Sequence, residues 1–119
     1  MSYLAVFVGG GIGSVLRFAL ARWAIASGRE LLWGTLAANV LACLLLGYLA
    51  SGLAGARLTP TTRLLLATGL CGGFSTFSTF SLEALTLAQN GRVAQAALYV
   101  ALSLLLGIAA VAFWGLRPS

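Results

Sequence analysis

The sequence predicts an all-α integral membrane protein with four transmembrane helices, and three observations support this fold class. Of 119 residues, 61% are hydrophobic and 8% are charged, whereas soluble domains have roughly 45–50% apolar and 25% charged residues. The apolar residues form four stretches, each long enough to cross a ~30 Å hydrocarbon core. Because lipid offers backbone groups no partner and the alternating pattern of a barrel is absent, these stretches must be helical.

The expected helices form one domain, residues 1–119, and cover residues 3–26, 31–53, 64–89 and 93–116. The first has no basic residue before it and contains Arg17, so we interpret it as a retained helix rather than a signal peptide. Glycine, proline or asparagine occurs in every connection, as turns require. In the second connection, Thr59 is expected to cap a helix with Pro60 at its first position.

The basic residues are all arginines, and the net charge is +5. In a membrane protein this charge bears on topology, so no nucleic-acid partner is expected. Three arginines lie on the side of the termini and three near the opposite side, namely Arg57, Arg63 and Arg117 against Arg22, Arg29 and Arg92. Such a balance gives little bias to membrane insertion. It therefore permits an antiparallel, dual-topology homodimer, with a monomer of one orientation as the alternative.

Small residues within the spans predict close helix contacts. Glycines at positions 9 and 13 and at positions 69 and 73 form two GxxxG pairs, which serve contacts either between subunits or within one. Cys43 and Cys71 both lie in predicted spans, and the chain has no histidine. Disulfide and zinc sites are therefore not expected, and packing is the expected role of both cysteines.

The stretch of residues 72–81 is unusual for the middle of a membrane span, since it combines two glycines and three phenylalanines with five hydroxyl residues. Paired glycines weaken a helix, and hydroxyls can satisfy freed backbone groups, so we predict a break near Gly72 to Ser75. Carbonyls ending the first half-helix would bind a cation, and N–H groups opening the second would favour an anion. The alternative is a continuous helix whose hydroxyls bond to their own preceding turn.

Two further spans carry polar stripes with a spacing of four residues, which places each stripe on one helix face. The stripes are Thr35, Asn39, Cys43 and Gly47 in the second span, and Tyr99, Ser103 and Gly107 in the fourth. An amide at membrane depth is costly unless paired, so Asn39 indicates either a water-filled path or an interhelical hydrogen bond. Tyr99 is either part of such a path or an ordinary core or interfacial aromatic residue.

Two charged residues and two aromatic residues complete the candidate site. Arg17 lies deep in the first span, and Glu83 is expected to form an ion pair with it or to lie on a permeation route. An inward-facing edge of Phe77 or Phe80 carries positive potential and could contact a small anion. The alternative for both rings is packing in the core.

No nucleophile with a base, metal-ligand cluster or phosphate-binding loop can be assembled from the sequence, so we do not expect an enzyme. The candidate lining is rich in N–H and O–H donors and poor in fixed negative charge. Such a lining favours an anion over a metal cation.

Three segments of the sequence, 9–17, 34–39 and above all 69–81 with its run Gly-Gly-Phe-Ser-Thr-Phe-Ser-Thr-Phe-Ser, closely resemble those of the Fluc (CrcB) fluoride channels. The resemblance extends over all four helices. It implies a fluoride-selective channel that exports fluoride passively as an antiparallel homodimer in a bacterial plasma membrane, the inner one where there are two. It also implies a structural sodium ion at the dimer centre.

Site residues follow from the same resemblance, by motif position. Backbone carbonyls of Gly72 and Ser75 would hold sodium, and Arg17 would attract anions to a vestibule. The fluoride path would comprise Asn39, Phe77, Phe80, Tyr99, Ser78, Thr79, Ser81, Ser103 and Glu83. Two positions depart from the family pattern: Ser75 replaces a common threonine, which leaves the carbonyl unchanged, and Gly107 replaces a hydroxyl residue found in some relatives.

Two rival functions are compatible with a short four-helix membrane chain. A proton-coupled multidrug exporter needs a membrane carboxylate, usually in the first helix, but that helix contains Arg17 and no carboxylate, while Glu83 lies in the third. A non-transporting assembly subunit needs only small-residue contacts.

Overall fold

Helices are the regular secondary structure of the described residues. The computed structural model describes residues 1–51 and 57–115, and these residues contain no strand. Helices α1 (Ser2–Ala26), α2 (Leu31–Ala50) and α7 (Val93–Gly115) are continuous, whereas the third segment is built from α4 (Pro60–Arg63), η1 (Leu64–Cys71), α5 (Gly72–Phe74) and α6 (Phe77–Gln89). Four helical segments are long and apolar enough to cross a membrane, which confirms the predicted fold class.

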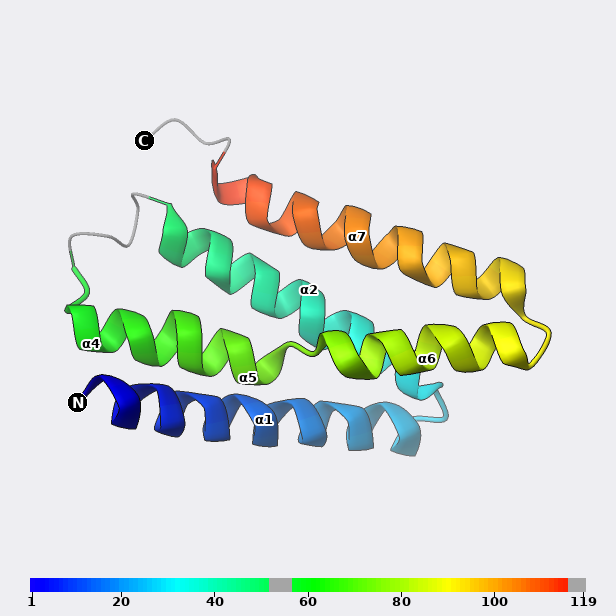
Figure 1. Ribbon diagram of the computed structural model, residues 1–119, viewed down its shortest axis with the longest axis horizontal. Helices are drawn as coiled ribbons and strands as arrows, with labels where there is room; N and C mark the ends of the chain where they lie inside the picture. Colours follow the sequence, from blue (N-terminus) through cyan, green and yellow to red (C-terminus); the bar gives the residue numbers. More distant parts are fainter. Residues whose placement is uncertain (52–56, 116–119) are drawn as a thin grey trace.

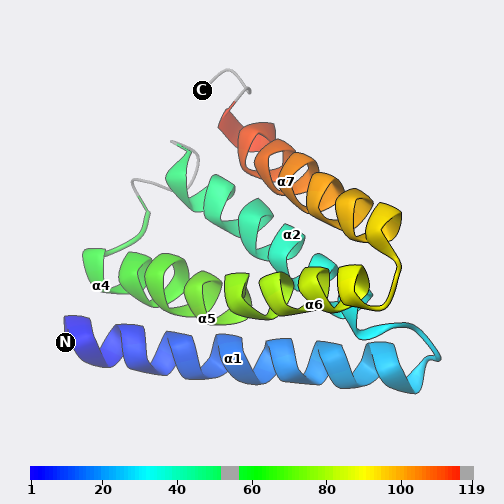
Figure 2. The same cartoon turned by 45° about the vertical axis from the view of Figure 1, so that its right-hand side comes forward.

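The four segments pack as two pairs (Figures 1 and 2). Helix α1 runs along the third segment, while α2 lies beside α7 and crosses the middle of the third segment. Helix α1 begins and α7 ends on the same side of the bundle. One cluster of buried residues lies where α2 meets α6 and α7, and a second joins α2 to η1 through Leu49 and Cys71. The first consists of Leu36, Phe80, Leu87, Ala96 and Tyr99.

The helix ends follow local chemistry. Thr59 accepts a 3.1 Å hydrogen bond from the Thr62 N–H, and Pro60 occupies the first turn, so the third segment begins four residues before the expected start of its helix. Glycines with φ of +78° follow the ends of α1 and α6, at Gly28 and Gly91. Glycine adopts this left-handed conformation without a Cβ clash, which makes it the usual residue after a helix C-terminus.

Helix α2 is shorter than expected. Its last helical residue is Ala50, and Ser51 is extended while its hydroxyl donates to the Tyr48 carbonyl at 2.7 Å. A serine hydroxyl competes with the helical hydrogen-bond ladder in this way. The remaining positions of the expected helix, 52 and 53, and the final position of the fourth, 116, lie outside the described residues.

The π-helical stretch η1 has no counterpart in the sequence prediction. A π-helix differs from an α-helix in which carbonyl each N–H reaches, five rather than four residues back. No residue type marks that choice, so only a helix could be expected over Leu64–Cys71.

Both glycine pairs lie at one contact inside the subunit, where α1 meets the third segment. A Cβ at Gly13 would lie 2.3 Å from the Leu70 carbonyl oxygen, and one at Gly73 would lie 2.3 Å from the Gly10 carbonyl oxygen. The two backbones therefore touch with no room for a methyl group. Packing within the subunit accounts for both GxxxG pairs, so neither pair is needed for contacts between subunits.

This contact predicts that Gly13→Ala lowers the free energy of unfolding by about 1–3 kcal/mol, because the added methyl group overpacks the contact. The matched control is Gly11→Ala on the same helix, where no atom lies within 4 Å of the added Cβ. The control should be neutral or stabilising by up to about 1 kcal/mol, since alanine favours helices. Denaturant titration in detergent micelles, followed by tryptophan fluorescence, measures both variants. Equal effects of the two substitutions would contradict the close contact.

Candidate functional site

The third segment is interrupted at Ser75 and Thr76. Both residues are extended, with φ/ψ of −85°/158° and −153°/116°, between the end of α5 and the start of α6. Gly72 and Gly73 were expected within the break, but they are helical. Gly73 is needed for the contact with α1, and the Ser75 N–H and hydroxyl both donate to the Cys71 carbonyl, which completes the last turn before the chain leaves the helix.

Asn39 of α2 stabilises the extended backbone at the interruption. Its Oδ1 accepts from the Thr76 N–H at 2.7 Å, and its Nδ2 donates to the Thr76 carbonyl at 3.2 Å. One amide side chain thus satisfies the donor and the acceptor of a residue that has left the helix. Without it, both groups would lack partners in the membrane, at a cost of several kcal/mol each in lipid. The interhelical hydrogen bond considered for Asn39 is therefore present.

The two half-helices present opposite dipole ends at the interruption. Helix α6 begins with N–H groups, of which the one at Thr79 is capped by the Thr76 hydroxyl at 3.2 Å. That hydroxyl also donates to the Thr79 hydroxyl at 3.1 Å and lies 3.4 Å from that of Ser78. Carbonyl groups end α5, and negative partial charge gathers there. An anion is therefore favoured on the α6 side and a cation on the α5 side.

Arg17 and Glu83 do not form the expected ion pair in the described structure. The Arg17 Nε donates to the Gly73 carbonyl at 3.1 Å, at the negative end of α5. Glu83 instead accepts from the Thr35 hydroxyl at 3.1 Å and the Tyr99 hydroxyl at 2.8 Å. The negative end of the helix dipole attracts the Arg17 guanidinium, and two neutral donors stabilise the Glu83 carboxylate. Each of the two charged groups is thus stabilised by groups other than the opposite charge.

Thr35 belongs to the site because its hydroxyl donates to the Glu83 carboxylate. From the sequence it was expected only in the polar stripe of the second span. It is buried and lies one turn before Asn39 on α2, and the Thr35–Glu83–Tyr99 contact links α2, α6 and α7. Thr76 was also missing from the predicted site. Its signal was the Thr-x-x-Thr spacing at the start of α6, which is typical of a capping hydroxyl.

The two phenylalanines lie in different surroundings. Phe80 is buried, and its ring centroid lies 5.2 Å from that of Tyr99. Phe77 is 78% exposed on the single subunit, with its ring centroid 5.8 Å from that of Phe80. The three rings form a row from the surface of α6 to the half-buried carboxylate of Glu83, which accepts from the Tyr99 hydroxyl.

The stripes of α2 and α7 face each other along most of their length. Tyr99 reaches Thr35 through Glu83, and a Cβ at Gly107 would lie 3.5 Å from the Cys43 sulfur. Between them, the Ser103 Oγ is buried with no hydrogen-bond partner among the described residues. A buried hydroxyl without a partner is costly and indicates a place for a water molecule or an ion.

The remaining predicted residues border the interruption. Ser78 and Ser81 are exposed on α6, and the Ser81 hydroxyl donates to the Phe77 carbonyl at 2.9 Å. Beside the interruption lies a cavity of about 290 Å³, whose polar lining is Arg17, Arg22, Thr35, Thr76 and Thr79. Apolar residues of α1 and α2 form the rest of the lining, so donors and positive charge occupy part of the cavity wall on this side.

The backbone oxygen atoms at the end of α5 are of the kind that binds sodium. The described residues contain no group of three His, Cys, Asp or Glu side chains that could hold a metal, so oxygen atoms of the backbone are the available ligands. Gly72 is exposed, and nothing lies within 4 Å of the position a Cβ would take. The Thr76 N–H, the usual helical partner of the Gly72 carbonyl, is bound by Asn39. Carbonyl oxygens left free in this way are suitable ligands for a hard cation.

Comparison with known proteins places the chain in a family. Residues 4–116 match the family model described as CrcB-like protein, Camphor Resistance (CrcB). Three relatives are each named Fluoride-specific ion channel FluC. The one from Rhizobium etli is 46% identical over 111 residues, covering 91% of this chain and 88% of the relative.

The other two relatives come from two other bacteria. The relative from Novosphingobium aromaticivorans is 48% identical over 106 residues, covering 87% of this chain and 84% of the relative. That from Phocaeicola vulgatus is 42% identical over 111 residues, covering 92% of each chain. A family match over nearly all of the sequence, with relatives at this identity, means that the chain belongs to the CrcB-like family.

Proposed function

We propose that this chain is a fluoride-selective ion channel that exports fluoride passively and so lowers its cytoplasmic concentration. The observation that carries the proposal is the interruption of a membrane-spanning helix by Ser75 and Thr76, held by Asn39. An interrupted helix places N–H dipoles and hydroxyls at mid-membrane, an arrangement that membrane transport proteins use to bind ions. The relatives that carry the name of a fluoride channel, which are not enzymes, support the choice of ion.

Fluoride is a small anion that must exchange its water shell for donors in the protein. The N-terminus of α6 and the hydroxyls of Thr79, Ser78 and Ser81 offer such donors without a fixed cation that would trap the ion. Arg17 beside the cavity attracts anions to the entrance. Because Asn39 has a second Nδ2 hydrogen, it can hold Thr76 and still donate to a passing ion.

The row of aromatic rings continues the route in this proposal. Ring edges of Phe77 and Phe80 would contact the anion through their positive potential. Beyond them, Tyr99 and the unpartnered Ser103 hydroxyl would form the next donors. Glu83 borders this path with its charge already stabilised by Thr35 and Tyr99.

The functional unit that we propose is an antiparallel homodimer in a bacterial plasma membrane. On a single subunit, Gly72, Ser78 and Ser81 are exposed in the middle of the span, where lipid offers no polar partner. A second copy would cover this face. The balanced arginines permit the copy to have the opposite orientation, and all three relatives come from bacteria.

Sodium would bind at the centre of this dimer. The Gly72 and Ser75 carbonyls of both subunits would hold it, and the ion would supply a fixed positive charge that offsets the negative ends of two α5 helices. Its role is structural, since a hard cation with oxygen ligands stabilises the two chains against each other.

Anion efflux from liposomes tests the proposed function. The purified protein, reconstituted into liposomes loaded with fluoride, should release fluoride rapidly and chloride at least 100-fold more slowly. Proton-coupled export of a quaternary ammonium dye, or equal rates for the two halides, would contradict a fluoride channel.

The same assay tests the aromatic route. Phe80→Ile should reduce fluoride efflux at least about tenfold, since it removes the ring edge that contacts the anion; a loss of about 1.4 kcal/mol gives this factor. The control is Phe7→Ile, an exposed ring on α1 outside the site. Both variants should retain the oligomeric state of the wild type, and undiminished efflux through Phe80→Ile would assign that ring to packing.

Sodium dependence of stability tests the cation site. Replacing sodium by N-methylglucamine should lower the melting temperature of the purified dimer, because a ligand at 100 times its Kd stabilises the folded state by about 2.7 kcal/mol. Ser75→Thr should behave as the wild type, since only the carbonyl binds. A melting temperature that is independent of sodium would exclude a structural ion.

A further inference from the structure

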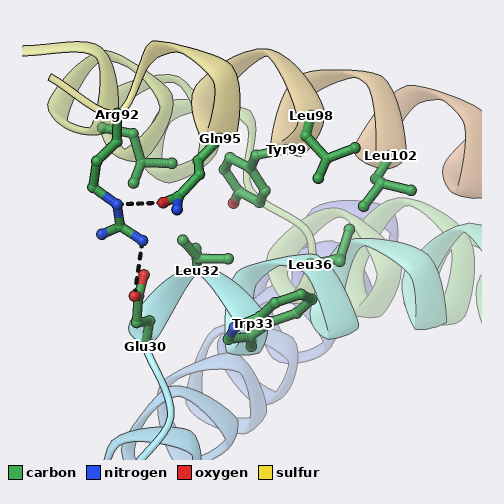
Figure 3. Close-up of a pocket in the computed structure, with 10 residues that line it drawn as sticks. Glu30, Leu32, Trp33, Leu36, Arg92, Gln95, Leu98, Tyr99 and Leu102 are labelled. Carbon is green, nitrogen blue, oxygen red and sulfur yellow. Dashed lines mark hydrogen bonds and ion pairs between the residues drawn. The ribbon is translucent and has the colours of Figure 1, made fainter.

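A groove lies between the first turns of α2 and α7, on the side of the bundle opposite the termini (Figure 3). It has a volume of about 270 Å³. Its lining includes Glu30, Arg92 and Gln95 together with apolar side chains such as Leu32, Leu36 and Leu98. The polar members gather at one end of the groove, and apolar side chains line the rest.

The depth of the groove corresponds to one leaflet of a bilayer. Arg92 precedes the first residue of α7 and Leu102 lies ten residues further on, a distance of about 15 Å along a helix. This is half of a ~30 Å hydrocarbon core. The groove therefore runs from the membrane surface to mid-membrane, and its half-exposed Trp33 lies near the surface end, where tryptophans favour the interface.

The surface end presents a cation and an anion side by side. The Arg92 Nη2 and Glu30 Oε1 are 3.0 Å apart, with side chains 40% and 51% exposed, and the Arg92 Nε donates to the Gln95 side chain. A guanidinium has five N–H donors, so three remain after these two bonds. The second oxygen of Glu30 is the other open position, since only Oε1 is bound to Arg92.

We propose that this groove binds one phospholipid with a phosphoethanolamine headgroup. The lipid phosphate accepts from the remaining N–H groups of Arg92, and the lipid ammonium donates to Glu30. One acyl chain lies along Leu32, Leu36, Leu98 and Leu102. The pair of opposite charges on the protein matches a zwitterion that carries both charges and donates N–H bonds. A phosphocholine headgroup has the same charges but no N–H to donate, so it binds more weakly.

Lipid titration of the full-length protein tests this proposal independently of transport. Delipidated protein in detergent is titrated with phosphatidylethanolamine or phosphatidylcholine of identical acyl chains, and bound lipid is counted by native mass spectrometry. The wild type should retain one phosphatidylethanolamine per subunit with at least tenfold preference over phosphatidylcholine. Arg92→Gln and Glu30→Gln should each reduce phosphatidylethanolamine binding, and Glu30→Gln should abolish most of the preference, because it replaces the charged acceptor of the ammonium by a neutral amide, whose hydrogen bond is weaker.

A matched pair of substitutions on α7 tests the apolar part of the groove. Leu98→Trp fills the groove and should prevent lipid retention, whereas Leu104→Trp, outside the groove lining with a similar exposure of 55% against 58%, should not. Both should leave the oligomeric state unchanged. The proposal would be overturned if the two lipids bound equally or if the groove variants left binding unaffected. Loss of the oligomer with Leu98→Trp alone would also overturn it, because this result would mean that a second copy of the chain covers the groove.

Discussion

The pair of hydrogen bonds between the Asn39 amide and the backbone of Thr76 is the contact on which the remaining site depends. It stabilises two extended residues inside a membrane span, where water cannot. Once the helix is interrupted there, the Thr76 hydroxyl caps α6, and the Gly73 carbonyl at the end of α5 accepts from Arg17. Donor and acceptor dipoles then meet at one depth, which no continuous helix achieves.

Close backbone contact fixes where that interruption lies. Because α1 touches the third segment without intervening side chains, α5 cannot shift along α1, and the Gly73 carbonyl stays within reach of the Arg17 side chain. On the other side, the Thr35–Glu83–Tyr99 contact ties α6 to α2 and α7. The two half-helices are thus positioned by different neighbours. This arrangement explains how a segment that is interrupted by two extended residues keeps a defined geometry.

Most of the fold could be predicted from the sequence, because apolar length, turn glycines and the Thr59–Pro60 start are local signals. The interruption was also predictable from its composition, and the predicted range of residues 72–75 reaches it at Ser75. Its extension to Thr76 was not predictable, and close packing against α1 keeps Gly73 helical. The partner of a half-buried charge depends on how helices rotate about their axes. For this reason the first of the two alternatives for Glu83, an ion pair with Arg17, was wrong: the two side chains have other partners. The role of Thr35 became visible only when its hydroxyl was seen on that carboxylate.

Fluoride efflux through an Asn39→Asp channel tests the central claim most directly. Aspartate can accept from the Thr76 N–H but cannot donate to its carbonyl, and it adds a negative charge beside the proposed anion route. We expect efflux to fall by at least about tenfold, the factor for 1.4 kcal/mol, whereas Asn90→Asp, at the exposed turn after α6, should transport as the wild type does. Equal, undiminished efflux through both variants would contradict the role of Asn39 in holding a conducting interruption.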